Sequence, residues 1–287
     1  MQSDSNSPDR IQTILGIDAA WSETNPSGVA LVQKRGPDWH CIRVASSYAS
    51  FVSGQLEETV NCSKVTMRRI PNADLLIETA TGLAGVQPDL VCIDMPMATT
   101  PIKKRRVADS CVSKMYGARW CAAHSPSAQR PGAISNKLRE DLGNLGYPLA
   151  TADMVAGTTR ALIEVYPHPA IVEFLRLQRR LPYKVSKAHT YWPGFSTGEK
   201  RENLLVEFHR LHDALTLVFG PLELPLPAVG SSGSLASLKR FEDALDALVC
   251  CWVGVHYLGG QKQAVALGDP ESAIWCPIVP TLSGSNA

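Results

Sequence analysis

The chain has 287 residues, of which 45% are hydrophobic and 19% are charged. This composition excludes global disorder and supplies enough apolar side chains for a large core. Lys and Arg total 28 and Asp and Glu total 27, so the net charge of +1 gives no bulk electrostatic reason to bind nucleic acid or a membrane. Any basic surface must be local.

The sequence shows no pattern typical of export or membrane insertion. No apolar stretch approaches the roughly 20 residues that span a bilayer, and residues 1–10 are polar. We therefore expect a cytoplasmic protein. The eight cysteines include no CxxC pair and several lie in apolar runs, which favours buried reduced thiols over disulfides or a zinc site.

The first part of the chain predicts a sheet rich in hairpins. Residues 1–10 are expected to form a disordered leader. The apolar run 13–18 predicts a buried strand that ends at a carboxylate, and runs 28–32 and 39–44 predict two further strands. Because Gly36-Pro37-Asp38 has good turn chemistry, we expect these strands to form a meander.

A helix and another buried strand follow. Residues 72–82 have helical spacing of apolar residues, with Asn72 as a candidate N-cap and Gly82 at the end. Residues 88–94 predict a strand that ends at Asp94. The order strand, helix, strand implies a right-handed crossover and a parallel pair.

The remaining elements complete a single α/β domain over residues 11–280. Residues 97–135 show little periodicity and predict a long functional insertion. Residues 160–165 predict a third buried strand that carries a carboxylate. The other predicted elements are helices over 170–178, 199–218 and 238–258, with a loop over 220–236.

Acidic residues stand at the ends of the three buried strands. Asp18, Asp94 and Glu164 each lie where an apolar run ends, and a buried strand carries such a charge only with a partner or a metal. Because the ends of parallel strands share one edge of a sheet, we expect the three acids to converge. Taken singly, a strand-end Asp can also cap the following turn, and Glu164 can pair with Arg160 or with a lysine.

The final helix carries a second acidic pair. Asp243 and Asp246 are three residues apart on one face of an otherwise apolar helix. Clustered oxygen ligands suit Mg²⁺ or Mn²⁺ rather than zinc. The alternative for Asp243 is a solvated position on the helix surface.

Four motifs together resemble those of the DUF429 family, predicted ribonuclease H-like nucleases of bacteria and archaea. They are Gly16-Ile-Asp18, Ile93-Asp-Met-Pro96, Glu164-Val-Tyr-Pro167 and Asp243-Ala-Leu-Asp246-Ala. The last also resembles the helix motif of RuvC-type Holliday-junction resolvases and their YqgF relatives. Over residues 12–278, the resemblance implies a mixed five-stranded sheet flanked by helices, with the first three strands antiparallel.

The same resemblance implies roles for the acidic residues. Asp18 and Asp94 would be metal ligands from the strands. Asp243 and Asp246 would be the pair from the final helix, with Asp246 the better match. Glu164 belongs to the DUF429 pattern as a catalytic candidate without an assigned role.

Basic residues supply candidates for substrate binding. Lys103-Lys-Arg-Arg106, followed by Asp109, resembles the Arg-x-x-Asp motif of the family. Arg forks match phosphate oxygens, so Arg105 and Arg106 are candidates; a solvated run or an Arg106–Asp109 pair is the alternative. Arg119 is a further candidate.

A second basic stretch, residues 176–187, contains Tyr183 and Lys184. Aromatic and basic residues at this spacing suit a single-stranded nucleic acid, and the alternative is a solvated helix end. Cys121 and His124 suggest a thiol nucleophile only weakly, because no group is placed to orient them.

The leading hypothesis is a metal-dependent phosphodiesterase that acts on DNA or RNA. Two divalent ions would be bridged by Asp18 and held by Asp94 with the Asp243 and Asp246 pair. A nucleotide-dependent phosphotransferase would need glycine-rich phosphate loops and a duplicated domain, and neither is found. The third hypothesis is a non-catalytic binding protein whose acids serve as capping groups.

Overall fold

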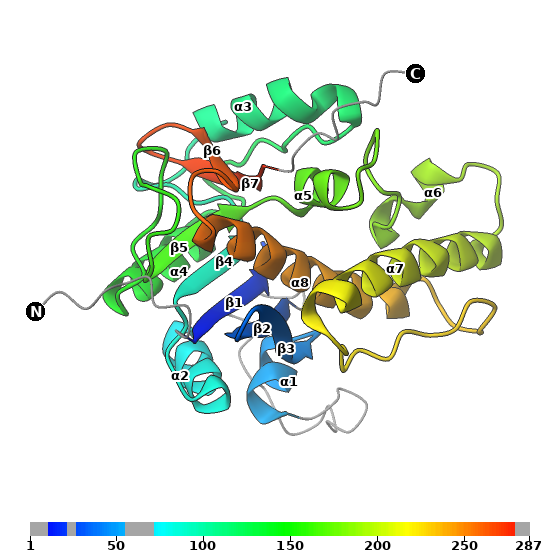
Figure 1. Ribbon diagram of the computed structural model, residues 1–287. Coiled ribbons are helices and arrows are strands. Elements are labelled where there is room, and N and C mark those ends of the chain that lie inside the picture. The colour runs from blue at the N-terminus through cyan, green and yellow to red at the C-terminus, as the bar shows by residue number, and fades with distance from the viewer. Residues whose placement is uncertain (1–10, 22–26, 55–71, 279–287) are drawn as a thin grey trace, which may run out of the picture.

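A seven-stranded mixed sheet forms the centre of the computed structural model (Figure 1). The structure describes residues 11–21, 27–54 and 72–278, so the expected leader over residues 1–10 lies outside the described ranges. The strand order is β3-β2-β1-β4-β5-β7-β6. The strands are β1 Gln12–Asp18, β2 Gly28–Arg35, β3 Asp38–Ala45, β4 Leu90–Asp94, β5 Ala161–Val165, β6 Ala264–Gly268 and β7 Ala273–Pro277.

Strand directions confirm the predicted meander and the predicted parallel pair. β1, β2 and β3 are successively antiparallel, whereas β1, β4, β5 and β7 run parallel to one another. The expectation of five strands is wrong. The β6–β7 hairpin, which follows the last helix, extends the sheet because β7 pairs with β5 and β6 forms the edge.

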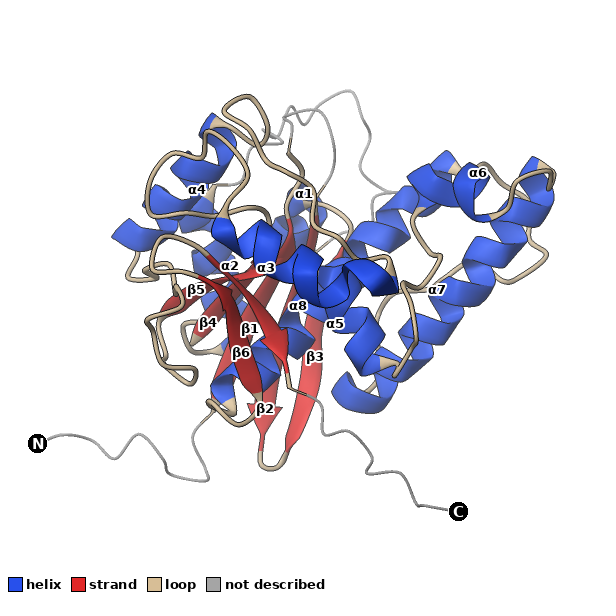
Figure 2. Cartoon of the chain, turned by 90° about the horizontal axis from the view of Figure 1, so that it is seen from above, coloured by secondary structure: helices blue, strands red, loops and turns tan. Residues whose placement is uncertain are grey.

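Helices cover both faces of the sheet (Figure 1). α5, α7 and α8 share one apolar core with the sheet, and α1, α2 and α4 share the other. α3 packs on β6 and β7, and the α6–α7 pair lies beyond the β3 edge (Figure 2). The helices are α1 Tyr48–Ser53, α2 Ala73–Ala84, α3 Val107–Tyr116, α4 Ala133–Asn144, α5 Pro167–Phe174, α6 Ala188–Tyr191, α7 Thr197–Phe219 and α8 Lys239–Leu258, with short 3-10 helices η2 Gly117–Arg119, η3 Val185–Lys187 and η4 Ala236–Leu238.

The alternation of side chains along β1 assigns each residue to one of the two cores. Ile14 packs in the α8 core, whereas Leu15 and Ile17 pack in the opposite core. Gly16 faces α8 so closely that a Cβ atom there would lie 2.2 Å from the carbonyl oxygen of Ala247. The absence of a side chain at position 16 therefore lets the helix rest on the strand backbone.

Several element boundaries differ from those predicted. α2 begins after Asn72, as expected, but its left-handed C-cap is Gly85 rather than Gly82. α5 spans Pro167–Phe174 rather than 170–178, because proline suits the first turn of a helix. The segment 97–135 contains α3 and the start of α4, neither of which was predicted.

Membrane-spanning helices and the state of the cysteines can also be compared with the predictions. Within the described ranges, no helix is both long and apolar enough to cross a membrane. The seven cysteines in those ranges are free thiols, and five of them are buried, as predicted. Cys62 lies outside the described residues.

Candidate metal centre and its surroundings

Three carboxylates meet where β1 and β4 end beneath α8. Asp18, Asp94 and Asp246 each offer an oxygen atom, and these three atoms lie within 4.8 Å of one another. β1 and β4 are parallel and pair Asp18 directly with Asp94, so both side chains leave the sheet on the same face. The predicted convergence of these three acids is therefore confirmed.

Close packing of α8 places its acids above the strand ends. A Cβ atom at Gly28, which pairs with Asp18 across β1 and β2, would lie 1.9 Å from the carbonyl oxygen of Asp243. The helix backbone thus lies directly on the sheet at this point. As a result Asp246 is fully buried, whereas Asp18 and Asp94 are half-buried at the rim.

Two side chains from the segment before α6 hold Asp246. The hydroxyl of Tyr183 donates to Oδ1 of Asp246, and the ammonium group of Lys184 donates to Oδ2. Lys184 Nζ also lies 3.1 Å from Oε1 of Glu242. Burial opposes the charge on Lys184, but Asp246 and Glu242 outweigh it and raise the pKa of the ammonium group.

A second lysine neutralises the acids in the first turn of α8. Lys239 Nζ donates to Oε1 of Glu242 at 2.8 Å and forms an ion pair with Asp243. Glu242 also accepts from the backbone N–H of Val185 at 2.7 Å. Asp243 is thus paired on the helix rather than solvated, and it lies next to Asp18 rather than in the three-carboxylate group.

Crowding of the acids makes their ionised forms unfavourable. Burial, followed by the charge of Asp243, raises the pKa of Asp18 to about 7. Burial and then Asp18 raise the pKa of Asp94 well above its ordinary value. Burial also raises the pKa values of Asp243 and Asp246 to about 6, although Lys239 and Lys184 limit these rises. Additional positive charge at this site would favour the ionised carboxylates.

Glu164 does not join this group. In the register of β4 and β5 it pairs with Ile93 rather than with Asp94, so its side chain leaves the opposite face of the sheet. There it accepts from both terminal nitrogens of Arg106, at 2.5 and 2.7 Å, and from the backbone N–H of Met97 at 2.7 Å. The partner of Glu164 is Arg106, not Arg160 or a lysine.

Comparison with family models identifies the family of this sequence. A model described as "Protein of unknown function (DUF429)" matches residues 16–271, which is most of the chain. The chain belongs to the DUF429 family. Searches of curated proteins and of solved structures found no match to the DUF429 chain.

The Arg-x-x-Asp motif of this DUF429 chain is an internal brace. All five N–H groups of Arg106 are engaged, by Glu164, by Asp109 and by the carbonyl oxygen of Met97. Asp109 also accepts from the backbone N–H of Arg106 at 2.8 Å. The pair with Asp109 that the sequence offered as the alternative is therefore present, and it fixes the segment between β4 and α3 to the sheet.

Arg105 and Arg119 also bond within the DUF429 chain. Arg105 donates to Ser113 at 2.6 Å, to Ser125 at 2.9 Å and to backbone oxygens of the same segment. Arg119 pairs with Glu173 and donates to the carbonyl oxygen of Leu177 at 2.6 Å. Of the five candidates for substrate binding, only Tyr183 and Lys184 contact the acidic group.

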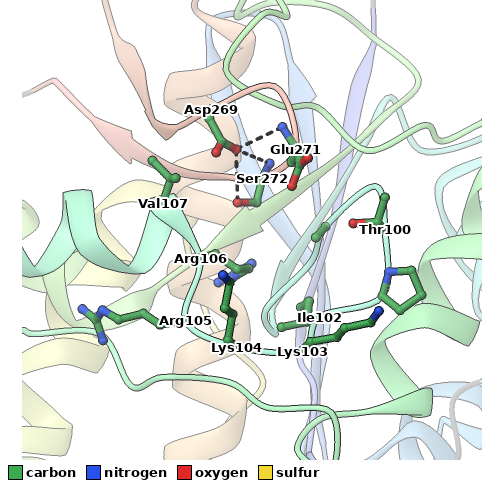
Figure 3. A pocket seen from close by; sticks show the side chains of 12 residues that line it. Thr100, Ile102, Lys103, Lys104, Arg105, Arg106, Val107, Asp269, Glu271 and Ser272 are labelled. Carbon is green, nitrogen blue, oxygen red and sulfur yellow. Dashed lines mark hydrogen bonds between the residues drawn. The ribbon is translucent and has the colours of Figure 1, made fainter.

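The basic run lines a separate cleft of about 390 Å³ (Figure 3). Its opposite wall is the β6–β7 turn, where Asp269 accepts hydrogen bonds from the backbone of Glu271 and Ser272. Lys103 and Lys104 are exposed there, and neither forms an ion pair with another described residue. This cleft does not include the three carboxylates.

Lys239 and Glu242 were not singled out from the sequence. Lys239 stands four residues before Asp243 on one helix, a spacing that brings opposite charges together, so a local signal was available. The proposed thiol nucleophile has no support: burial raises the pKa of Cys121 to about 11, and the thiol is protonated at neutral pH.

Proposed function

We propose that this DUF429 protein is a metal-dependent nuclease of the ribonuclease H-like type, which hydrolyses phosphodiester bonds with Mg²⁺ or Mn²⁺ held by Asp18, Asp94 and Asp246. The observation that carries the proposal is the approach of three carboxylate oxygens to within 4.8 Å. Oxygen ligands on opposite sides of one Mg²⁺ lie about 4 Å apart. Adjacent ligands lie about 3 Å apart, so the three oxygens would have to draw closer together to share one ion.

The charge at the site fits a dication. Among the described residues at this site, five carboxyl groups and two ammonium groups act on one another. The carboxyl groups are those of Asp18, Asp94, Glu242, Asp243 and Asp246, and the ammonium groups are those of Lys184 and Lys239. Oδ2 of Asp243 is buried and has no hydrogen-bond donor among the described residues. Each oxygen of Asp246 accepts one hydrogen bond and keeps a further lone pair.

The donor chemistry narrows the choice of metal and reaction. The three candidate ligands, Asp18, Asp94 and Asp246, all offer hard carboxylate oxygens, which suits Mg²⁺ or Mn²⁺ rather than zinc. Such an ion supplies Lewis-acid stabilisation of phosphoryl oxygens and lowers the pKa of water. One N–H group of Lys184 donates to Asp246, and the ammonium group forms an ion pair with Glu242, so a further N–H group remains to donate to a phosphate oxygen beside the carboxylates.

The topology supports the ribonuclease H-like part of the proposal. The first three strands are antiparallel, as the resemblance implied, and β4 and β5 lie parallel to β1. Two strand ends and the last helix supply the acids. The β6–β7 hairpin is an addition at the edge beyond β5 and supplies none of the three carboxylates.

A second candidate function is that of a non-catalytic binding protein. The observation that favours it is the pair of lysines, Lys184 and Lys239, which already bond three of the acids from within the chain. In this alternative, the acids and lysines form a structural ion-pair network. This alternative predicts that divalent ions do not change the free energy of unfolding.

Cleavage assays distinguish these functions. Wild type and Asp18→Asn would be incubated with end-labelled DNA and RNA, single-stranded, duplex and branched, in Mg²⁺, in Mn²⁺ and in EDTA. The proposal predicts metal-dependent cleavage that falls by orders of magnitude in Asp18→Asn, because a neutral amide is a poor bridging ligand. Glu78→Gln, which removes an exposed charge from α2, is the matched control and should retain full activity. Wild type that cleaves no substrate with either metal would contradict the proposal.

A further inference from the structure

Trp120 is a large aromatic residue that the core does not use. It follows η2 with φ 64° and ψ 24°, a left-handed backbone conformation that bulky residues rarely adopt. Its backbone N–H closes the turn onto the carbonyl oxygen of Gly117 at 3.0 Å, and the residue is 62% exposed. Core packing therefore does not explain why a tryptophan stands where glycine is the ordinary choice.

Arg179 packs on this exposed ring, and further arginines lie near it in the chain. The guanidinium carbon of Arg179 lies 4.5 Å from the ring centroid of Trp120, which covers one side of the indole and restricts its motion. The backbone N–H of Arg180 donates to the carbonyl oxygen of Arg119 at 2.8 Å, so the two segments are joined side by side. Arg176 and Arg179 are both exposed. A local basic surface thus exists on a chain of almost zero net charge.

A continuous series of contacts connects this surface to the carboxylates. The hydroxyl of Tyr166, a residue just beyond β5, donates to the carbonyl oxygen of Ala122 at 3.3 Å. The Tyr166 ring stacks edge-on against His168 at 5.2 Å, and His168 stacks against Tyr183 at 5.7 Å. Tyr183 in turn donates to Asp246.

The chain itself sets an upper limit on the separation. Arg179 lies beside Trp120 and Lys184 lies against Asp246, and the Cα atoms of Arg179 and Lys184 are at most about 17 Å apart because only five residues of chain separate them. The lengths of these two side chains add to the distance between the Trp120 ring and the carboxylates. A single strand with a phosphate at the acids can therefore reach Trp120 within several nucleotides. The ring of Tyr183, which the sequence suggested for this purpose, is fully buried.

We infer that Trp120, backed by Arg179, is a stacking platform for an unpaired nucleobase that flanks the phosphate bound at Asp18, Asp94 and Asp246. This inference rests on the proposed nuclease function and names its substrate class: a nucleic acid with a single-stranded segment beside the cleaved bond. The indole ring accepts any base by stacking, and the neighbouring arginines attract the backbone without reading sequence.

Binding in EDTA tests the platform separately from cleavage. The probe is fluorescein-labelled oligothymidylate, single-stranded or annealed to oligoadenylate, and the readout is fluorescence anisotropy. Trp120→Gly removes the ring and relaxes the left-handed backbone, so the fold is retained. We expect tighter binding of the single strand by wild type, and a roughly 10- to 100-fold weaker affinity in Trp120→Gly. Trp120→Phe should recover most of the loss.

Two further readouts separate stacking from charge. The dependence of affinity on salt should be the same in wild type and Trp120→Gly, because the arginines that contact phosphate are intact. Phe195→Ala removes another exposed aromatic ring, before α7, and should bind as wild type does. Single-strand affinity of Trp120→Gly within about twofold of wild type would overturn the inference, as would a wild type that binds no oligonucleotide.

The outcomes also separate the two proposals. Trp120-dependent binding without cleavage in any metal supports the platform and contradicts the nuclease. Metal-dependent cleavage that is unchanged in Trp120→Gly supports the nuclease and contradicts the platform.

Discussion

Replacing Asp18 with asparagine should stabilise the metal-free protein. The Asp18 carboxyl stands half-buried beside Asp94, Asp243 and Asp246, and burial followed by the charge of Asp243 raises its pKa from 3.8 to about 7. In the unfolded chain the pKa returns to its ordinary value. Between these two pKa values the folded state holds a proton that the unfolded state has released.

The sign of the effect follows from this difference. Unfolding releases a proton between about pH 4 and pH 7, so the contribution of Asp18 to stability falls as the pH rises through that range. At about 1.4 kcal/mol per unit, the full shift corresponds to about 4 kcal/mol above pH 7. Solvent screening at a half-buried carboxyl reduces this, and we expect Asp18→Asn to be more stable by about 2–3 kcal/mol near pH 8.

Urea denaturation in EDTA, near pH 5 and near pH 8, measures this difference. The advantage of Asp18→Asn should grow as the pH rises, because only wild type ionises at position 18. Glu78→Gln, which removes an exposed negative charge, should show no such growth. A loss of about 0.5–2 kcal/mol at both pH values would instead identify Asp18 as a turn cap and refute the reasoning.

Three further predictions concern metal, brace and helix packing. Millimolar Mn²⁺ should raise the melting temperature of wild type but not of Asp246→Asn. A free Mn²⁺ concentration of about 100 times Kd adds about 2.7 kcal/mol to the free energy of unfolding. Equal shifts in both proteins would mean that the ion binds elsewhere. Arg106→Gln leaves Glu164 buried without its counter-charge and should lower the free energy of unfolding by about 3–5 kcal/mol in urea titrations. A loss near zero would mean that the Arg106–Glu164 pair does not stabilise the fold. Gly16→Ala should destabilise the folded protein by about 1–3 kcal/mol, because α8 must shift to make room for the added methyl group. Gly82→Ala in α2 places its methyl group in open space and should stabilise the protein slightly. Calorimetric melting measures both variants, and equal effects would contradict the close-packing argument.

The acidic group was predictable because its signals are local. Asp18 and Asp94 each end an apolar run, and parallel strands bring such ends to one edge. Helical spacing put Asp243 and Asp246 on one face of the final helix, and the resemblance to the DUF429 family favoured Asp246. The two strand ends could thus be read within single segments, whereas the choice of Asp246 came from the family motif.

Glu164 shows where that reasoning ends. It too ends an apolar run, but β5 pairs with β4 one residue out of step, so Glu164 stands opposite Ile93. A shift of one residue moves a side chain to the other face of a sheet. Register depends on the packing of distant elements and cannot be read from one strand, and the contact of Lys184 with Asp246 across 62 residues is similarly non-local.

Other omissions had local signals. The β6–β7 hairpin consists of two short apolar runs around Gly268-Asp-Pro-Glu-Ser272, a sequence rich in turn residues. α3 buries Ala108, Val112 and Tyr116, which recur every four residues. These elements were predictable in existence, whereas the position of the hairpin beside β5 was not.

Calorimetric titration of Mn²⁺ into wild type and Asp94→Asn tests the central claim most directly. Asp94 accepts no hydrogen bond from another described residue at the rim of the site, so asparagine there removes a ligand charge with little other change. We predict saturable binding by wild type, with proton release measured by repeating the titration in buffers of different ionisation enthalpy, because the carboxyls with raised pKa values must ionise to bind metal. Asp94→Asn should bind far more weakly. Wild type that binds no Mn²⁺, or Asp94→Asn that binds it equally well, would contradict the assignment of Asp18, Asp94 and Asp246 as a metal site.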